Sequence, residues 1–215
     1  MPYIPKEERP AIDAKVEALA EEISEALGRG GANKETEVSV HYRRSFLAVA
    51  RTLLLLEKGR TLRGAPGPAK SLALEVFSGG QQSGSSGHKG SWLGRLNYAL
   101  TRLIQVVPRK MVDKGFWKEE FRYWLYAQTV GALVRSAMEI HAQGDDWATD
   151  GIVGVLFDVK DEYKRRVNSA YEAFQIRKAG DCYTTRYRTE LSEVKDAASG
   201  SVVGYSEIMK DFGTG

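Results

Sequence analysis

The chain has 215 residues, of which 42% are hydrophobic and 27% charged, and its 31 basic and 28 acidic side chains leave a formal net charge of +3. These are the values of a globular domain that buries a core without a disulfide or a structural metal. They argue against a dedicated nucleic-acid binder, which would carry a strong basic excess.

The single cysteine, Cys182, indicates where the protein resides. One thiol cannot form an internal disulfide, which favours a reducing compartment. The N-terminal sequence MPYIPKEERP has no apolar run of signal-peptide length. The longest apolar stretch, near residues 46–56, falls short of the roughly 20 residues of a membrane span. We therefore expect a cytoplasmic protein with no membrane partner.

The first predicted element is a helix that begins near Pro10, because proline is tolerated in a first helical turn. Apolar residues then recur at spacings of three and four, which predicts an amphipathic helix: Ile12, Val16, Leu19, Ile23 and Leu27. Glutamates occupy most of the opposite face: Glu17, Glu21, Glu22 and Glu25. Gly28, followed by Gly30 and Gly31, is expected to end this helix.

A second helix is predicted from about Thr36 or Val40 to Lys58, on the helical spacing of its apolar residues. Residues 59–90 are predicted to be a flexible insertion, because the segments GAPGPAK and GGQQSGSSGHKG have the composition of a loop. Within the insertion a short buried element is expected at its apolar residues Leu72, Leu74, Val76 and Phe77.

Three more helices are predicted further along the chain. The first begins near Ser91 and is ended by Pro108, and the second runs from Phe116 to Ile140 before Gly144. The third is capped by Asp150 and closes near residue 179. The predicted fold is an all-α bundle of four to five helices over residues 1–183, followed by an irregular C-terminal arm over 184–215.

Three segments stand in order along the chain: MPYIPKEER at the start, GRLNYALTRL from Gly94, and GVLFDVKDEYKRRVNSAYEAFQIRKAGDCY from Gly154 to Tyr183. Together they resemble a family of small uncharacterised proteins of bacteria, archaea and phages, whose members share an MPYI start, a G-x-LNY-x-IT helix and a GVLE-x-AK-x-E-x-YRRV-x-x-YE helix followed by GD-x-Y. The resemblance implies an all-α fold and no established activity, and it suggests a phage or mobile-element origin.

The chain departs from this family pattern at several positions. Phe157 stands where the family has an acidic residue, Lys164 where it has an aromatic one, and Ala173 where it has an acidic one. Because the family is shorter, residues 32–90 and the tail beyond Tyr183 are expected to be additions.

The basic run at Arg165 and Arg166 is the strongest candidate for a binding site. Two guanidinium groups can grip a phosphate or a carboxylate. Residues that would surround such a ligand are Asn97, Tyr98, Tyr163, Tyr171 and Tyr183. The structural alternative is that the arginines pair along the helix, at about 0.3–0.5 kcal/mol per pair, with Asp161, Glu162 and Glu172.

Asparagine is a poor helix former, so Asn97 in the middle of a predicted helix needs a structural or functional explanation. A hydrogen bond across the bundle, to Tyr163 or to the turn at 180–181, would explain it structurally. A contact with a ligand would also explain it.

Six acidic residues and one histidine near the last two predicted helices are candidates for a metal site: Glu139, His141, Asp145, Asp146, Asp158, Asp161 and Glu162. Glu139 and His141 are only two residues apart, so they point to different sides of a helix. Asp158 and Glu162 share a face, but no second pair completes a site. We expect no metal and no cofactor, and Cys182 has no local base for nucleophilic catalysis.

Two functional hypotheses follow from these patterns. The first is a non-enzymatic binding or assembly protein, a helical homo-oligomer whose segment 116–142 and C-terminal arm contact a protein partner. The second is a protein that binds a nucleotide or another phosphate-containing small molecule at the arginine face, as a sequestering protein or a weak metal-dependent hydrolase. The first is favoured, because no catalytic motif is complete.

Overall fold

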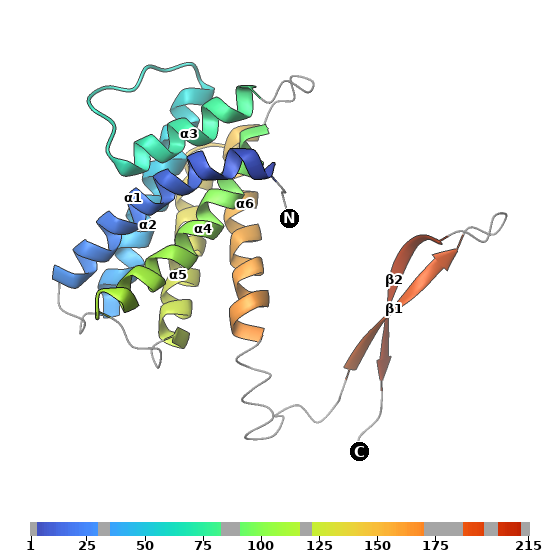
Figure 1. Cartoon of the computed structure of the whole chain (residues 1–215). Helices are drawn as coiled ribbons and strands as arrows, with labels where there is room; N and C mark the ends of the chain where they lie inside the picture. The colour runs from blue at the N-terminus through green and yellow to red at the C-terminus, as the bar shows by residue number, and fades with distance from the viewer. Residues whose placement is uncertain are drawn as a thin grey trace. The chain divides into compact units, whose positions relative to one another are not determined.

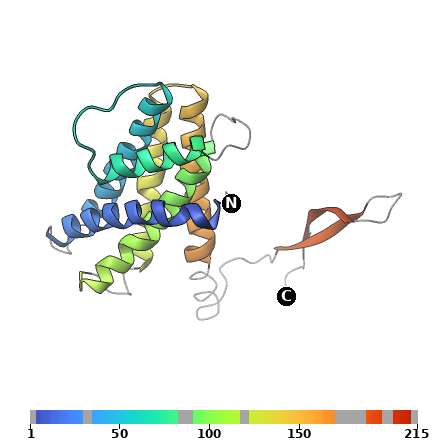
Figure 2. The ribbon, with the colours of Figure 1, turned by 45° about the horizontal axis from the view of Figure 1, so that its top comes forward.

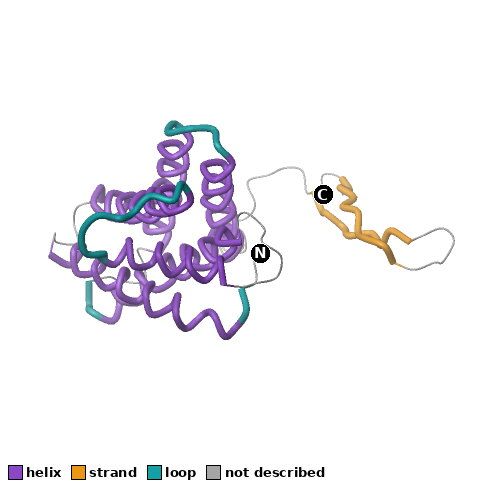
Figure 3. The backbone as a smooth tube through the Cα atoms, turned by 90° about the horizontal axis from the view of Figure 1, so that it is seen from above, coloured by secondary structure: helices purple, strands orange, loops and turns teal. Residues whose placement is uncertain are grey.

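The computed structural model describes residues 4–29, 35–82, 91–116, 122–169, 187–195 and 202–211. The chain divides into two compact units, Met1–Ser169 and Ala170–Gly215, and each is described by itself. The first unit is built from helices, which confirms the predicted all-α bundle (Figure 1). Strands are found in the described part of the second unit, where Figure 3 draws them in orange.

Six α-helices form the described part of the first unit, one more than the sequence predicts at most. Helices α1, α3 and α4 pack on one another and are called the first helix group. Helices α2, α5 and α6 are called the second helix group. The groups meet where α2 packs on α3 and α4 on α6, and α1 crosses the direction of the second group (Figure 2). The helices are α1 Arg9–Arg29, α2 Glu35–Glu57, α3 Pro68–Gln82, α4 Ser91–Asp113, α5 Arg122–His141 and α6 Trp147–Tyr163.

Two short helical turns flank this set. A 3₁₀ turn, η1 Lys6–Glu8, precedes α1, and a π-helical turn, η3 Lys164–Asn168, follows α6. No helix in the described ranges combines the length and apolar character that crossing a membrane requires.

The predicted apolar stripe of α1 is confirmed, because its five members are at most 6% exposed: Ile12, Val16, Leu19, Ile23 and Leu27. The acidic face of α1 is used as well. Asp13 accepts from Arg102 on α4 at 3.2 Å, Glu17 pairs with Lys110 at 2.9 Å, and Glu21 pairs with Lys110 at 3.1 Å. Acids further along α1 meet bases further along α4, so the two helices run parallel along a seam of ion pairs.

The prediction that Pro108 ends its helix is wrong. Proline removes one backbone hydrogen bond from a helix interior, yet α4 continues to Asp113. The turn beyond the proline is anchored, since Met111 is buried and Lys110 binds α1. The helix ends at Asp113, and the φ of 71° at Gly115 allows Phe116 N to donate back to Met111 O at 2.8 Å.

Helix α1 ends at Arg29, within the run of Gly28, Gly30 and Gly31 that was predicted to end it, and Gly28 itself lies inside the helix. The ring of Phe116 lies directly over this glycine, and a Cβ added there would lie 2.3 Å from a ring carbon. Gly28 therefore allows Phe116, which lies just beyond the end of α4, to pack closely against α1 at the far end of the α1–α4 seam.

The interpretation of residues 59–90 as a loop insertion is wrong for 68–82, which form α3. The helix begins at a proline, where the missing N–H costs nothing, and it buries Leu72, Ala73 and Val76 completely. The expected short buried element is thus a helix of 15 residues. Its Gly79 and polar C-terminal end, which suggested a loop, belong to the helix.

The C-terminal arm, predicted to be irregular, contains an antiparallel hairpin of β1 Tyr187–Lys195 and β2 Val202–Asp211. The register sets Leu191 opposite Glu207, with an irregularity between Val194 and Lys195. The segment between the strands is DAASGS, which lacks a two-residue hairpin signal such as Asn-Gly, so the hairpin could not be predicted from it. The predicted boundary at 183 lies outside the described residues.

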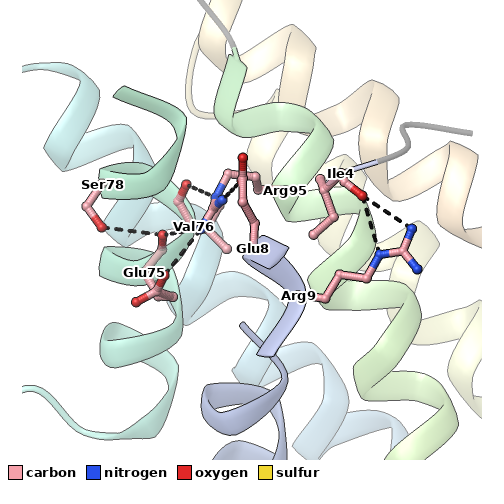
Figure 4. Close-up of polar contacts among 7 residues, drawn as sticks. All are labelled: Ile4, Glu8, Arg9, Glu75, Val76, Ser78 and Arg95. Atoms are coloured by element: carbon pink, nitrogen blue, oxygen red, sulfur yellow. Dashed lines mark hydrogen bonds and ion pairs between the residues drawn. The ribbon is translucent and has the colours of Figure 1, made fainter. Parts of the chain in front are cut away.

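Arg95 on α4 joins the N-terminus to α3 (Figure 4). Its side chain is 5% exposed and ion-pairs with Glu8 of η1 and with Glu75 of α3. Its Nε donates to the Val76 carbonyl at 3.2 Å, and its Nη2 donates to the Glu75 carbonyl at 3.2 Å. A Cβ on Gly79 would lie 2.1 Å from the guanidinium, so this glycine lets Arg95 reach the helix backbone.

Replacing Arg95 with methionine is expected to lower the free energy of unfolding by about 2–4 kcal/mol. The substitution keeps the aliphatic bulk but leaves Glu8 and Glu75, each about a quarter exposed, facing a buried apolar group. Urea unfolding followed by circular dichroism measures the effect.

The matched control is Arg109→Met on the same helix. Arg109 is 61% exposed and pairs with Glu17, so its loss is expected to cost less than about 1 kcal/mol. Equal losses for the two variants would show that Arg95 contributes no more than a surface charge.

Candidate functional site

Asn97 and Tyr98, both predicted site residues, lie on α4. Asn97 is 8% exposed, and its Oδ1 accepts a hydrogen bond from Thr101 Oγ1, one turn further along the same helix, at 3.4 Å. This is a local contact within α4, whereas a bond across the bundle to Tyr163 or to the turn at 180–181 was predicted. That turn lies outside the described residues.

The hydroxyl of Tyr98 donates to Asp13 of α1 at 3.0 Å, and Arg102 Nε donates to the same carboxylate at 3.2 Å. Above the ring stands the Arg9 guanidinium, 5.7 Å from its centroid. Burial, followed by the bond to Asp13, raises the pKa of Tyr98. These contacts tie Tyr98 into the α1–α4 seam.

Tyr163, the last residue of α6, is a core residue with 8% exposure. Its ring packs against Tyr126 of α5, with the centroids 5.2 Å apart. Tyr42 of α2 lies near it with a fully buried hydroxyl, and burial raises the pKa of Tyr42 well above its ordinary value. The nearby hydroxyl of Thr129 offsets part of this rise in the pKa of Tyr42. Among the described residues, none forms a hydrogen bond of ordinary geometry with Tyr42 Oη.

Arg165 and Arg166 lie in the π-helical turn η3, and both bind Glu162. Arg165 makes a two-pronged contact, with Nε and Nη2 donating to the two carboxylate oxygens at 2.9 and 3.0 Å, and Arg166 Nε donates to Oε1. Bonds from Arg165 and then Arg166 lower the pKa of Glu162 to about 2. The two guanidinium-bearing side chains are 64% and 50% exposed, whereas Glu162 is 14% exposed.

In this geometry Glu162 offsets the charge of one of the two exposed arginines. An anion could bind there only by sharing the guanidinium groups with Glu162 or by displacing it. Of the three acidic partners expected, the structure supplies Glu162, while Asp161 pairs with Lys160 at 2.9 Å. Glu172, Tyr171 and Tyr183 lie outside the described residues.

The described candidates therefore form two groups. Asn97 and Tyr98 take their contacts from α4 and α1, whereas Tyr163 contacts α5 and the two arginines hold Glu162. Tyr98 and Tyr163 contact neighbouring helices, whereas Asn97 and the two arginines bind partners within α4 and within the α6–η3 segment. Among the described residues, no contact joins the two groups into one cleft.

Four of the acidic residues that are candidates for a metal site have basic partners: Glu139, Asp146, Asp161 and Glu162. Glu139 of α5 accepts from Arg43 and Arg51 of α2, and the bond from Arg43 is the main reason that its pKa is lowered. Asp146 pairs with Lys58 at 3.0 Å. Across the part of the chain that the structure describes, no three histidine, cysteine or acidic side chains converge so as to hold a metal ion.

Asp146 is the N-cap of α6, so the prediction of Asp150 as the cap is wrong. Asp146 Oδ1 accepts from Thr149 N and from Thr149 Oγ1, both at 2.9 Å, and Asp150 lies in the first turn. Three aspartates precede the apolar run, and the threonine three residues after Asp146 is the signal that could have identified it. The bond from Thr149 N is the largest cause that lowers the pKa of Asp146 from 3.8 to about 2.

The chain was compared with protein families, curated proteins and solved structures. The model of one family, described as Domain of unknown function (DUF6899), matches residues 1–182. The chain belongs to this family. No curated protein and no solved structure matches it.

Membership of DUF6899 confirms the resemblance to a family without an established activity. The match spans residues 1–182, a range that includes residues 32–90 and therefore α3. The tail beyond residue 182 lies outside the match, as expected.

Replacing Asp146 with asparagine tests the cap and its charge. The amide oxygen can still accept from Thr149 N, but the attraction to Lys58 is lost, so we expect a lower Tm at neutral pH. Because the pKa of Asp146 is depressed in the folded chain, its charge stabilises fully above the ordinary value of 3.8, and this contribution is lost as the pH falls through about 2.

The difference in Tm between wild type and Asp146→Asn should therefore shrink as the pH is lowered from about 5 toward 2, measured by thermal melts. Asp145→Asn is the control, because that neighbouring side chain is exposed and forms neither an ion pair nor a cap among the described residues. A difference that stays constant with pH would contradict the assignment.

Proposed function

We propose that this member of DUF6899 is a non-enzymatic binding or assembly protein that forms a helical homo-oligomer. The ionisable groups considered for chemistry serve other contacts: Tyr98 binds Asp13, Glu162 binds two arginines, and Asp146 caps α6. Groups held in this way support the packing of helices rather than turnover of a substrate.

The observation that carries the proposal is the outward surface of the second helix group. Of the seven large hydrophobic side chains that stand substantially exposed in the described residues, five lie on α2, α5 and α6: Val40, Leu55, Met138, Trp147 and Phe157. Met138 of α5 is 66% exposed, the most of the seven. Trp147 also packs on Trp92 of α4, with the ring centroids 6.2 Å apart. Exposed large apolar side chains such as Met138 support the proposal of a protein–protein contact.

The proposal includes a cytoplasmic location, supported by the single cysteine, and a phage or mobile-element origin, supported by the family resemblance. A contact of the C-terminal arm with partner subunits also belongs to it. The β1–β2 hairpin has two strands, and a two-stranded sheet is marginally stable without further packing.

Light scattering on the purified chain during size-exclusion chromatography tests the proposal. We expect a single mass that is a small multiple of 23.8 kDa and that persists on dilution. A chain that elutes with the mass of one copy at every concentration would overturn the homo-oligomer.

A second function is favoured by one observation, the exposure of Arg165 and Arg166 in a π-helical turn. Turns of this kind occur frequently at functional sites. On this alternative, the arginine face binds a nucleotide or another phosphate-containing small molecule, for sequestration or for weak metal-dependent hydrolysis.

This alternative predicts that a nucleotide raises the Tm of the chain, because a ligand that binds only the folded state stabilises it. The variant Arg166→Ala should abolish that rise, in a thermal-shift assay with a panel of nucleotides and inorganic phosphate. The control Arg109→Ala removes an exposed arginine from α4 and should leave the rise unchanged. A rise in Tm that survives Arg166→Ala would exclude the arginine face as its site.

A further inference from the structure

Among the described side chains, the outward surfaces of α2 and α5 carry an excess of positive charge. Four exposed arginines lie on these helices, and two of them bind Glu139: Arg43, Arg44, Arg51 and Arg135. The other described glutamate of α2, Glu57, accepts a hydrogen bond from Trp92 of α4. Arg44 and Arg135 form no ion pair among the described residues. Val40 and Leu55 are exposed beyond either end of the three α2 arginines, and Met138 is exposed between Arg135 and Glu139. We call this surface the basic stripe.

The outward surface of α6 has the opposite character. Its exposed positions recur at spacings of three and four, which place them on one face of the helix: Asp150, Gly154, Phe157, Asp158 and Asp161. Asp150 and Asp158 form no ion pair within the described ranges, whereas Asp161 pairs with Lys160, whose amine also lies 5.1 Å from the centroid of the Phe157 ring. Gly154 lies open, since a Cβ added there would meet no atom within 4 Å. This is the acidic stripe.

The two stripes match in the spacing of their charges. At 1.5 Å per residue, the basic stripe spans about 22 Å from Val40 to Leu55, and the acidic stripe spans about 17 Å from Asp150 to Asp161. Asp150 and Asp158 are separated by about 12 Å along α6, and Arg43 and Arg51 by the same distance along α2. Each stripe also exposes large hydrophobic side chains, Leu55 and Met138 on one and Phe157 on the other.

We infer that the acidic stripe of one copy of the chain docks on the basic stripe of a second copy. This inference rests on the proposed homo-oligomer and names its interface. Exposed Phe157 and the bare backbone at Gly154 would face Met138 and the small residues Ala127 and Gly131 of α5. Since every copy offers both stripes, the contact is reciprocal in a dimer or repeats from copy to copy in a larger assembly.

Charge reversal on each stripe tests the interface. The variants Asp150→Lys/Asp158→Lys and Arg44→Glu/Arg135→Glu each place like charges against one another, so we expect each to weaken association by about 100-fold or more in analytical ultracentrifugation. An equal mixture of the two should reassociate, because each reversed stripe then meets a complementary one.

The matched control is Arg60→Glu/Arg63→Glu, which makes the same change of charge at two exposed positions between α2 and α3. It should retain the wild-type association. Circular dichroism of each variant checks that the helices remain folded.

Salt provides a second measurement that needs no variant. Association through exposed charges should weaken as the ionic strength rises from about 50 mM to about 500 mM. Wild-type mass in both stripe variants, or association insensitive to salt, would overturn this interface and leave the homo-oligomer intact. A wild-type chain of single-copy mass under all conditions would overturn the homo-oligomer itself, and this interface with it.

Discussion

The buried guanidinium of Arg95 is the constraint on which the first helix group depends. A charge removed from water costs several kcal/mol unless it is paired and hydrogen-bonded. Here Glu8 and Glu75 supply the negative charge, and two backbone carbonyls of α3 accept further bonds. Those partners come from η1 and α3, so α4 cannot shift against either without leaving the arginine unsatisfied. The charge thereby fixes an arrangement that apolar packing alone would leave free to slide.

Beyond Arg95, ion pairs also join α1 to α4 along the seam, and their desolvation costs less free energy because they are less buried. Asp13 with Arg102 and Glu17 with Lys110 are partly exposed, so each pair contributes little to stability. Their value lies in register, because a shift of one helical turn would set acids against the wrong partners. Phe116 over Gly28 closes the far end of the seam by shape. These ion pairs join charged residues of α1 to charged residues of α4. The surfaces of α2, α5 and α6 lie outside this seam.

Local contacts were the part that the sequence could predict. The apolar stripe of α1 and the pairing of Glu162 with Arg165 and Arg166 depend on residues three or four apart, so helical spacing is enough to find them. Glu8 and Arg95 are 87 residues apart, and Asp13 and Tyr98 are 85 apart, and no periodicity connects them. Tyr98 was therefore predicted as a ligand contact, whereas its described partners belong to the seam.

Errors at helix ends have the same origin. A proline or glycine signals where a helix can stop, but tertiary contacts decide whether it does. Helix α4 passes Pro108 because Lys110 and Met111 are held on the far side. In α3, the buried residues Leu72 and Val76 outweigh a composition typical of loops.

A pair of arginines on one carboxylate occurs twice in the second helix group, and its two settings differ. Arg43 and Arg51 reach Glu139 across two helices, so that pairing fixes α2 to α5 while keeping a net positive charge on their shared surface. Arg165 and Arg166 reach Glu162 within a single turn and fix no neighbouring helix through it. The first arrangement joins positive charge to a broad, partly apolar surface between helices, which suits a macromolecular partner. The second presents charge at one point, which suits a small anion, and this contrast in extent is the physical reason for placing assembly before ligand binding.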